Sequence, residues 1–335
     1  MKEAMFYTKL SESTVKCHLC PHYCEIEINA SGKCGVRANK EGVLYSTVYG
    51  NPCSVAVDPI EKKPLFHFMP GSRSLSIATV GCNFSCDFCQ NWQISQSPKS
   101  NNKIIGEKLN PDEVVEIALQ ENCKSISYTY TEPTIFYEYA YDISEIAQKK
   151  GLKNVFVTNG YISKPAIVKI CKYLDAANID MKGFSEEFYE QRCGAKLQPV
   201  LDAIRCYYDK GVWIEITTLI VPGHNDSEEM LKKIAEFIVS IDTRIPWHVS
   251  RFHPDYKMID VRPTDVAVLH KAVEIGKKAG LKYVYCGNLY GNDYESTYCP
   301  KCGKKVIERR GYSILKQELN NKLCSFCNEK IDLVL

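Results

Sequence analysis

Three cysteines close together in the sequence could hold a metal centre. Cys82, Cys86 and Cys89 form a C-x3-C-x2-C pattern. Three thiolates on one short loop can bind three irons of a cubane cluster, and the fourth iron then stays open to an exogenous chelating group. Structural zinc sites prefer four protein ligands, so zinc would need a remote fourth ligand here. The spacing therefore predicts a [4Fe-4S] cluster with one open iron.

Two cysteine pairs further along the chain indicate a second metal site. Cys299 and Cys302 form one C-x2-C pair, Cys324 and Cys327 form the other, and 21 residues separate the pairs. This spacing is close to that of zinc ribbons, in which two knuckles close a tetrahedral site. We predict structural zinc, with a rubredoxin-like iron or a cluster as the alternatives.

A third group of cysteines lies near the start of the sequence. Cys17, Cys20 and Cys24 follow one another closely, and nine residues separate Cys24 from Cys34. Four thiolates suit either zinc or a fully ligated iron–sulfur cluster. An auxiliary cluster would relay electrons, whereas zinc would serve folding alone. Both readings stay open from the sequence, and we favour zinc.

The composition sets the context for these cysteines. The chain has 335 residues, 45% hydrophobic content, a net charge of +2 and 17 cysteines. No signal peptide and no run of ~20 apolar residues is visible, so we predict a cytoplasmic protein without a membrane partner. In a reducing compartment, short cysteine spacings indicate metal ligation rather than disulfides. The near-neutral charge disfavours nucleic acid as a partner.

Strand-like and helix-like segments alternate over residues 74–288. The predicted strands are 75–80, 125–129, 154–158, 175–180, 212–220, 247–250 and 282–285. The predicted helices are 134–149, 164–173, 199–209, 227–241 and 264–279, with a further helix after the Asn110 cap. This alternation predicts an α/β fold with a parallel sheet. About six repeats fall short of the eight of a closed barrel, so we predict an open, partial (β/α)6 barrel.

The cysteine-rich ends flank this barrel as small metal-binding extensions. We divide the chain into a cysteine-rich segment 1–73, a barrel 74–288 and a zinc-ribbon-like domain 289–335. In parallel α/β barrels, the chemistry lies where strands end and the following loops begin. Residues that can bind or ligate occur at the ends of successive predicted strands: Cys82–Cys89, Thr129–Glu132, Thr158–Gly160, Asn178, Asp180, Lys182, Thr217, Thr218, His248, Arg251 and His253.

The cysteine motif, placed after the first strand of a βα series and with Phe88 before its last cysteine, resembles that of the radical S-adenosylmethionine (SAM) superfamily. The resemblance implies a partial barrel of the radical SAM type. It also implies that the methionyl amine and carboxylate of SAM chelate the open iron. Electron transfer from the cluster then cleaves the sulfonium, and the resulting 5′-deoxyadenosyl radical abstracts hydrogen from a substrate.

The same resemblance implies roles for residues at the strand ends. Thr131 and Glu132 stand in the place of a motif that contacts the methionyl amine, although the paired glycines of that motif are missing. Other segments are similar to those of glycyl-radical-enzyme activases, in which the Asp and Lys lie near the cofactor's carboxylate and the Asp can hold a monovalent cation. The remaining residues implied to bind the cofactor are Phe88, Thr158, Asn159, Asn178, Asp180, Lys182 and, near the adenine, His253. Val157 and Thr217 depart from the activase pattern, which often has an acid and a base there.

Over the whole chain, the sequence is similar to the radical enzymes of the AmmeMemoRadiSam system. The matching stretches are residues 17–24, 129–134, 217–223 and 246–256 and the paired cysteines of the tail. This resemblance implies AMMECR1-like and Memo-like proteins as partners, an electron donor such as flavodoxin or ferredoxin, and a small-molecule or protein substrate. The alternatives are a glycyl-radical-enzyme activase, a non-catalytic Fe–S and zinc protein for electron transfer or scaffolding, and an RNA-modifying radical enzyme.

Overall fold

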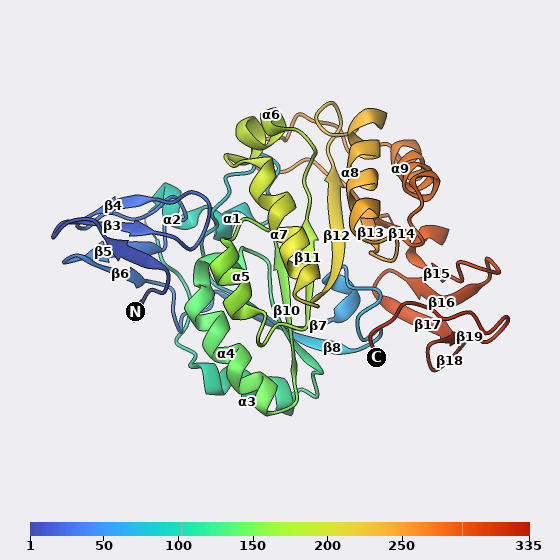
Figure 1. Ribbon diagram of the computed structural model, residues 1–335, viewed down its shortest axis with the longest axis horizontal. Helices are drawn as coiled ribbons and strands as arrows, with labels where there is room; N and C mark the ends of the chain where they lie inside the picture. Colours follow the sequence, from blue (N-terminus) through green and yellow to red (C-terminus); the bar gives the residue numbers. More distant parts are fainter. Residues whose placement is uncertain (102, 290) are drawn as a thin grey trace.

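The computed structural model describes residues 1–335 except 102 and 290, and an eight-stranded sheet forms its centre (Figure 1). The strand order is β14-β13-β12-β11-β10-β9-β8-β7. The strands are β7 (Ser54–Pro59), β8 (Arg73–Ala78), β9 (Ser125–Tyr128), β10 (Lys153–Thr158), β11 (Ala176–Asp180), β12 (Trp213–Ile220), β13 (Trp247–Arg251) and β14 (Val284–Gly287). Strands β8 to β14 are parallel, and β7 pairs with β8 in the antiparallel sense. Within the described residues no pairing joins β14 to β7, so the predicted open α/β barrel is confirmed.

Helices lie along one side of the sheet (Figure 1). They are α1 (Trp92–Ser95), α2 (Ser97–Asn101), α3 (Pro111–Gln120), α4 (Tyr137–Lys149), α5 (Lys164–Ile170), α6 (Glu186–Phe188), α7 (Leu197–Asp209), α8 (Glu228–Ile241) and α9 (Val266–Ala279). Helix α8 shows why they pack there, because Leu231, Ile234 and Ile238 lie on one face and are buried. The predicted capping box of α3 is present: the Asn110 backbone N–H donates to Glu113 Oε2 at 2.6 Å. Of the helices in the described part of the chain, none has the length and apolar character that crossing a membrane requires.

The first 50 residues contain two small antiparallel sheets. Their strands are β1 (Lys2–Glu3), β2 (Tyr7–Lys9), β3 (Thr14–Cys17), β4 (Glu25–Glu27), β5 (Arg37–Lys40) and β6 (Val43–Ser46). Val15, Leu19 and Val36 are buried in the same hydrophobic core as the barrel residues. Strand β7, inside the predicted segment 1–73, belongs to the central sheet, so that sheet begins before residue 74.

The chain ends in short hairpins at the opposite end of the molecule (Figure 1). Their strands are β15 (Thr297–Tyr298), β16 (Lys305–Arg310), β17 (Ser313–Gln317), β18 (Leu319–Asn320) and β19 (Leu323–Cys324). Val306, Ile307 and Ile331 form a separate small core with Cys299 and Cys324. So few apolar residues cannot stabilise a domain of this size by burial alone, and the predicted metal at the four cysteines would add the missing stability.

Candidate active site

A cavity lies at the carboxyl ends of the parallel strands. It encloses about 1600 Å³ of unfilled space, part of which is open to solvent. Because parallel strands end at the same edge of the barrel, residues far apart in sequence meet here. Its lining includes Cys82, Cys86, Phe88, Cys89, Thr131, Glu132, Asn159, Asp180, Lys182, Thr217 and His248. Most of the residues that the sequence placed at strand ends are therefore brought together.

The three cysteines of the loop 81–92 all face this cavity. Among the described residues, one group of three or more potential metal-ligand atoms lies mutually within 4.8 Å. That group consists of the C-terminal cysteines Cys299, Cys302, Cys324 and Cys327, and does not include the cysteines of this loop. The thiols of Cys82, Cys86 and Cys89 are therefore too widely spaced to share one ion, whereas the irons of a cubane lie at separate corners. A hydrogen bond with the Cys193 thiol, together with burial, raises the pKa of Cys86 well above its usual range. Metal binding must displace that proton.

The cysteine loop is fixed by hydrogen bonds to two neighbouring parts of the barrel. Asn83 Nδ2 donates to the Tyr161 carbonyl at 2.8 Å, and Asn159 Nδ2 donates to Asn83 Oδ1 at 2.8 Å. On the other side, the Ser85 N–H donates to the Cys193 carbonyl at 2.9 Å. No spacing signal in the sequence connects Cys193 with the loop. The loop geometry is thus set before any metal binds.

Asp180 and Lys182 form an ion pair beside the cysteine loop. The Lys182 ammonium lies 3.0 Å from Asp180 Oδ2 and 5.9 Å from the centre of the Phe88 ring. Burial disfavours the Lys182 charge, but Asp180, Cys86 and Cys193 outweigh it and raise its pKa well above the usual range. The pair lines the cavity rather than the outer surface. It offers one cation and one anion to a bound zwitterion.

Glu132 connects the ends of two strands. Its carboxylate accepts hydrogen bonds from the Thr134 N–H at 2.9 Å and the Thr134 hydroxyl at 2.6 Å. It also accepts from the Thr158 hydroxyl at 2.8 Å and the Asn159 N–H at 2.7 Å. Burial raises the pKa of Glu132 in spite of these donors. With four donors already bound, Glu132 shapes the cavity wall between β9 and β10. Thr131 also lines the cavity and donates to the Thr79 carbonyl at 2.8 Å.

Three of the predicted cofactor residues do not line the cavity. Asn178 donates from Nδ2 to the carbonyl of Pro64 at 2.8 Å. The Thr158 hydroxyl donates its hydrogen bond to the Glu132 carboxylate. His253 is exposed, and its Nδ1 accepts from Gln90 Nε2 at 3.0 Å, which places it at the rim beside the cysteine loop.

A group of charged residues on the β7 side was not anticipated from the sequence. The Asp58 carboxylate accepts four hydrogen bonds. Its donors are Lys62 at 2.8 Å, Lys63 at 2.7 Å, Ser76 at 2.7 Å and the Tyr130 hydroxyl. Burial opposes the charge of Asp58, but these donors lower its pKa well below the usual range. Burial lowers the pKa of Lys63 to about 8 in spite of its carboxylate partner. The two lysines line the cavity from its edge.

The floor of the cavity is a buried polar network. His248 Nε2 lies 2.7 Å from Glu215 Oε2, and both side chains are buried. Glu215 also accepts from the backbone N–H groups of Phe66 and His67. Burial opposes the charge of Glu215, but the contact with His248 lowers its pKa. Thr217 Oγ1 is buried at the cavity without a hydrogen-bond partner, so it is available to a ligand.

The C-terminal cysteines form the compact group mentioned above. The Sγ atoms of Cys299 and Cys327 lie 3.6 Å apart, those of Cys302 and Cys324 3.8 Å apart, and all four lie within 4.8 Å of one another. Four thiolates around one tetrahedral ion at ~2.3 Å would be about 3.8 Å apart. A backbone hydrogen bond at Lys304 lowers the pKa of Cys302 to about 7, which favours the thiolate that a metal needs. The arrangement fits a single metal ion.

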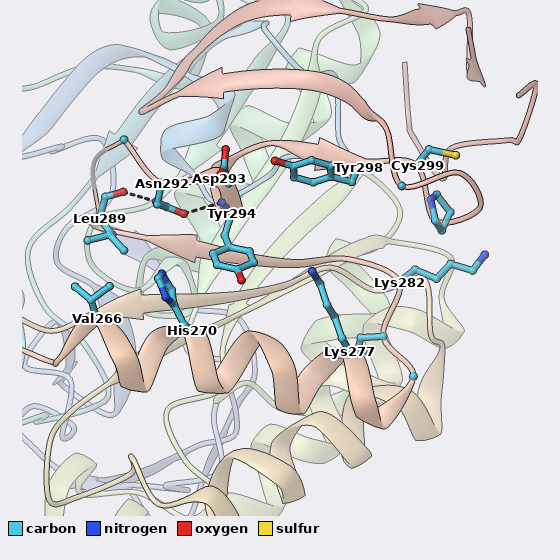
Figure 2. A pocket seen from close by; sticks show the side chains of 15 residues that line it. Val266, His270, Lys277, Lys282, Leu289, Asn292, Asp293, Tyr294, Tyr298 and Cys299 are labelled. Carbon is cyan, nitrogen blue, oxygen red and sulfur yellow. Dashed lines mark hydrogen bonds between the residues drawn. The ribbon is translucent and has the colours of Figure 1, made fainter. Parts of the chain in front are cut away.

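A second cavity lies between helix α9 and the C-terminal hairpins. Figure 2 shows His270 and Lys277 of the helix facing Tyr294 and Tyr298 across it. It shares no lining residue with the cavity of the cysteine loop. One of its lining residues, Cys299, belongs to the C-terminal cysteine group.

Comparison with known proteins agrees with the geometry. Residues 76–238 match the family described as the Radical SAM superfamily. The uncharacterized protein MJ0808 of Methanocaldococcus jannaschii is 48% identical over 338 residues, which cover 100% of both chains. A putative glycyl-radical enzyme activating enzyme of the same organism is 25% identical over 62% of this chain and 78% of its own. A radical SAM methyltransferase from Sphaerobacter thermophilus shares the fold with a TM-score of 0.52 at 14% identity, covering 65% and 67% of the two chains.

Proposed function

The chain belongs to the radical SAM superfamily, and from this premise we propose that it is an enzyme that cleaves SAM with a [4Fe-4S] cluster held by Cys82, Cys86 and Cys89. One observation carries the proposal: three thiols too widely spaced for a single ion line the same cavity as a partly buried Asp–Lys pair. The bound cofactors would supply a 5′-deoxyadenosyl radical that abstracts hydrogen from a small molecule or a partner protein.

The side chains around the cavity would hold and orient SAM. Lys182 offers a cation to the methionyl carboxylate, and Asp180 offers an acceptor to the amine. A monovalent cation on Asp180 is the alternative for that residue. Phe88, Thr131 and Asn159 form the walls between which the methionyl group would lie, and His253 and Gln90 would meet the adenine at the rim. Orientation is the protein's contribution here, because the chemistry belongs to the cofactors.

Cleavage of SAM by single cysteine variants tests this function. Anaerobically reconstituted protein should release 5′-deoxyadenosine in the presence of a strong reductant. Cys82→Ala, Cys86→Ala and Cys89→Ala should each abolish the release, because a cluster that loses one protein ligand no longer positions its open iron. Cys171→Ala, a half-buried cysteine away from the cavity, serves as the control. Retained turnover in any of the three variants would contradict the assignment.

For the wider reaction we propose a one-electron donor of the flavodoxin or ferredoxin kind and AMMECR1-like and Memo-like partner proteins. The support is the whole-chain resemblance described above. A glycyl-radical-enzyme activase is the second candidate, and it is favoured by the relative that bears that name. Deuterium transfer from the substrate into 5′-deoxyadenosine distinguishes the two candidates. Transfer from deuterated glycine in a glycyl-radical enzyme would support the activase, whereas transfer from a deuterated AMMECR1-like or Memo-like partner would support the first candidate.

We propose zinc for the C-terminal cysteines, because their spacing fits one tetrahedral ion. Cys302 is the most exposed of the four, so Cys302→Ser should remove the metal with little loss of packing. Metal analysis of the full chain should then show one zinc fewer with iron unchanged. Loss of iron instead would mean a rubredoxin-like site.

A further inference from the structure

The four N-terminal cysteines line one small cavity. Cys17 lies at the end of β3, Cys20 and Cys24 lie in the connection to β4, and Cys34 precedes β5. The cavity contains about 320 Å³ of unfilled space, part of which is open to solvent. Two of the thiols, Cys17 and Cys34, are buried. The fold thus brings four thiols from separate parts of the segment to the lining of one cavity.

The spacing of these thiols differs from that at the C-terminal site. No three of them lie mutually within 4.8 Å, whereas all four C-terminal thiols do. A tetrahedral ion draws its thiolates to about 3.8 Å from one another. A cubane cluster separates them, because each thiolate binds a different iron corner. The wider spacing and the space between the thiols suit a cluster and not one zinc ion.

The surroundings suit a cluster with net negative charge. Leu19, Ile26 and Ile135 supply apolar walls. Lys33 adds positive charge to the lining, and Arg37, which is paired with Glu138, also lines it. The four-cysteine cavity therefore has mostly apolar walls and a nearby cation, which suit a cluster that carries negative charge.

The cavity also touches the loop that holds the catalytic cysteines. His22, between Cys20 and Cys24, has its Nε2 2.8 Å from the carbonyl of Asn83, the residue after Cys82. On the other side, a Cβ placed on Gly81 would lie 3.0 Å from the Cys34 carbonyl oxygen. Residues adjacent to the ligands of one site therefore contact residues adjacent to the ligands of the other.

We propose that Cys17, Cys20, Cys24 and Cys34 bind an auxiliary [4Fe-4S] cluster that passes single electrons to the cluster of the Cys82 loop. A low-potential protein donor is oxidised by one electron, the auxiliary cluster is reduced and then reoxidised, and the second cluster receives that electron. No bond forms or breaks in this transfer and no proton moves. Cluster binding stands on geometry alone, whereas the electron transfer rests on the proposed function. The inference replaces zinc, which the sequence favoured at this site.

Metal and sulfide content of variants reconstituted anaerobically with iron and sulfide tests the binding. In the triple variant Cys82→Ala/Cys86→Ala/Cys89→Ala the N-terminal site is intact, so iron and sulfide should fall to half the parent's content and the remainder should give a cubane Mössbauer spectrum. Cys20→Ser/Cys24→Ser should also halve both, and Cys123→Ser should leave them unchanged. A triple variant that holds a second zinc ion besides the one proposed for the C-terminal cysteines, or iron without sulfide, or that one zinc alone, would overturn the proposal.

The electron transfer has its own test. With a reduced ferredoxin or flavodoxin as donor, Cys20→Ser/Cys24→Ser should lose SAM cleavage, while with dithionite it should cleave as the parent does. Equal loss with both reductants, or no loss with either, overturns the relay. A parent protein that never cleaves SAM instead defeats the proposed function, and the metal analysis still decides whether the auxiliary cluster exists.

Discussion

Lys182 carries a buried charge, and the way that charge is satisfied explains how the site would select its ligand. The ammonium lies 3.0 Å from Asp180 Oδ2 and also interacts electrostatically with the thiols of Cys86 and Cys193. In the resting protein the ion pair satisfies both groups. A zwitterionic ligand can replace each partner by an equivalent one, so it binds without leaving a buried charge uncompensated.

Removing either member of this pair should weaken SAM binding. Each charge-assisted hydrogen bond contributes about 1.5–3 kcal/mol, which corresponds to roughly 10- to 100-fold in the dissociation constant. Asp180→Asn and Lys182→Ala should each show a loss of this size in equilibrium binding, with cluster content matched to the parent. Lys232 and Glu236 form an exposed pair at 3.7 Å and supply the control, for which Lys232→Ala should change binding by less than about twofold. Parent-like binding by both site variants would refute the positioning role.

The site residues show where sequence reasoning succeeds and where it stops. Asp180 and Lys182 could be placed at the mouth because strand ends converge. The orientation of Asn178 could not, since its side chain is turned by the Pro64 carbonyl, a contact across 114 positions of sequence. Lys63 was missed for a related reason: its place depends on β7, an edge strand without a clear alternating pattern.

Among the elements, the cysteine loop depends on a glycine that has no room for a side chain. Gly81 has φ +104, and an added Cβ would lie 2.8 Å from Val36 Cγ1 and 3.0 Å from the Cys34 carbonyl oxygen. The glycine therefore permits β8 to turn into the loop directly against the N-terminal segment.

Gly81→Ala should destabilise the protein and reduce its iron content. Gly151 is a matched control because it has φ +81 but nothing within 4 Å of an added Cβ. Gly151→Ala should cost about 1 kcal/mol for the backbone conformation alone. Gly81→Ala should cost roughly 1–3 kcal/mol more, because the clash forces the packed backbone apart. Thermal unfolding and iron analysis of both variants measure the difference, and equal effects would show that crowding plays no part.

The strands of the barrel were predictable and those of the N-terminal segment were not. Strands such as β10 and β12 are rich in β-branched and aromatic residues and are largely buried, as strands of a sheet covered on both sides are. By contrast, β1 and β4 span only two and three residues and are largely exposed. Their pairing is fixed by tertiary contacts and by the cysteines between them, and no short-range pattern records it.

Across the whole molecule, a buried histidine joins the end of the chain to the barrel. His67 Nδ1 donates to the Asp332 carbonyl at 2.7 Å, Nε2 accepts from Tyr285 at 2.6 Å, and the Val334 N–H donates to the His67 carbonyl at 2.8 Å. Burial lowers the pKa of His67 to about 4, although Glu215 acts in the opposite direction. The C-terminal residues that contact His67 therefore dock on the barrel only while the His67 imidazole is neutral.

Acid should loosen this tail. The exposed state has a histidine pKa of about 6.5 and so binds more protons than the docked state between pH 6.5 and 4. The contribution of His67 is therefore complete above about pH 6.5 and is lost as the pH falls towards 4. Between pH 7 and 5 the free energy of local opening should fall by about 2 kcal/mol. Hydrogen exchange at residues 331–334 measures it, and His67→Asn should flatten the dependence. An equal fall in that variant would assign it to other groups.

A buried ion pair joins the N-terminal segment to the barrel. Arg37 of β5 lies 2.9 Å from Glu138 of α4, and both side chains are almost completely buried. Lys2 and Asp142 span the same two parts of the protein at 3.1 Å, but they are exposed. The two pairs therefore compare a buried and a solvated ion pair across one interface.

Arg37→Met should destabilise the protein by about 3–5 kcal/mol, because it leaves the Glu138 charge buried without a partner. Adding Glu138→Leu should restore most of the loss, since replacing both charges by apolar groups removes the desolvation cost. Lys2→Met should cost less than about 1 kcal/mol. Denaturant unfolding at matched iron content gives the three values, and hydrogen exchange at residues 37–46 locates the opening. If Arg37→Met and Lys2→Met cost the same, or if the double variant is no better than Arg37→Met, packing and not the ion pair holds the segment on the barrel.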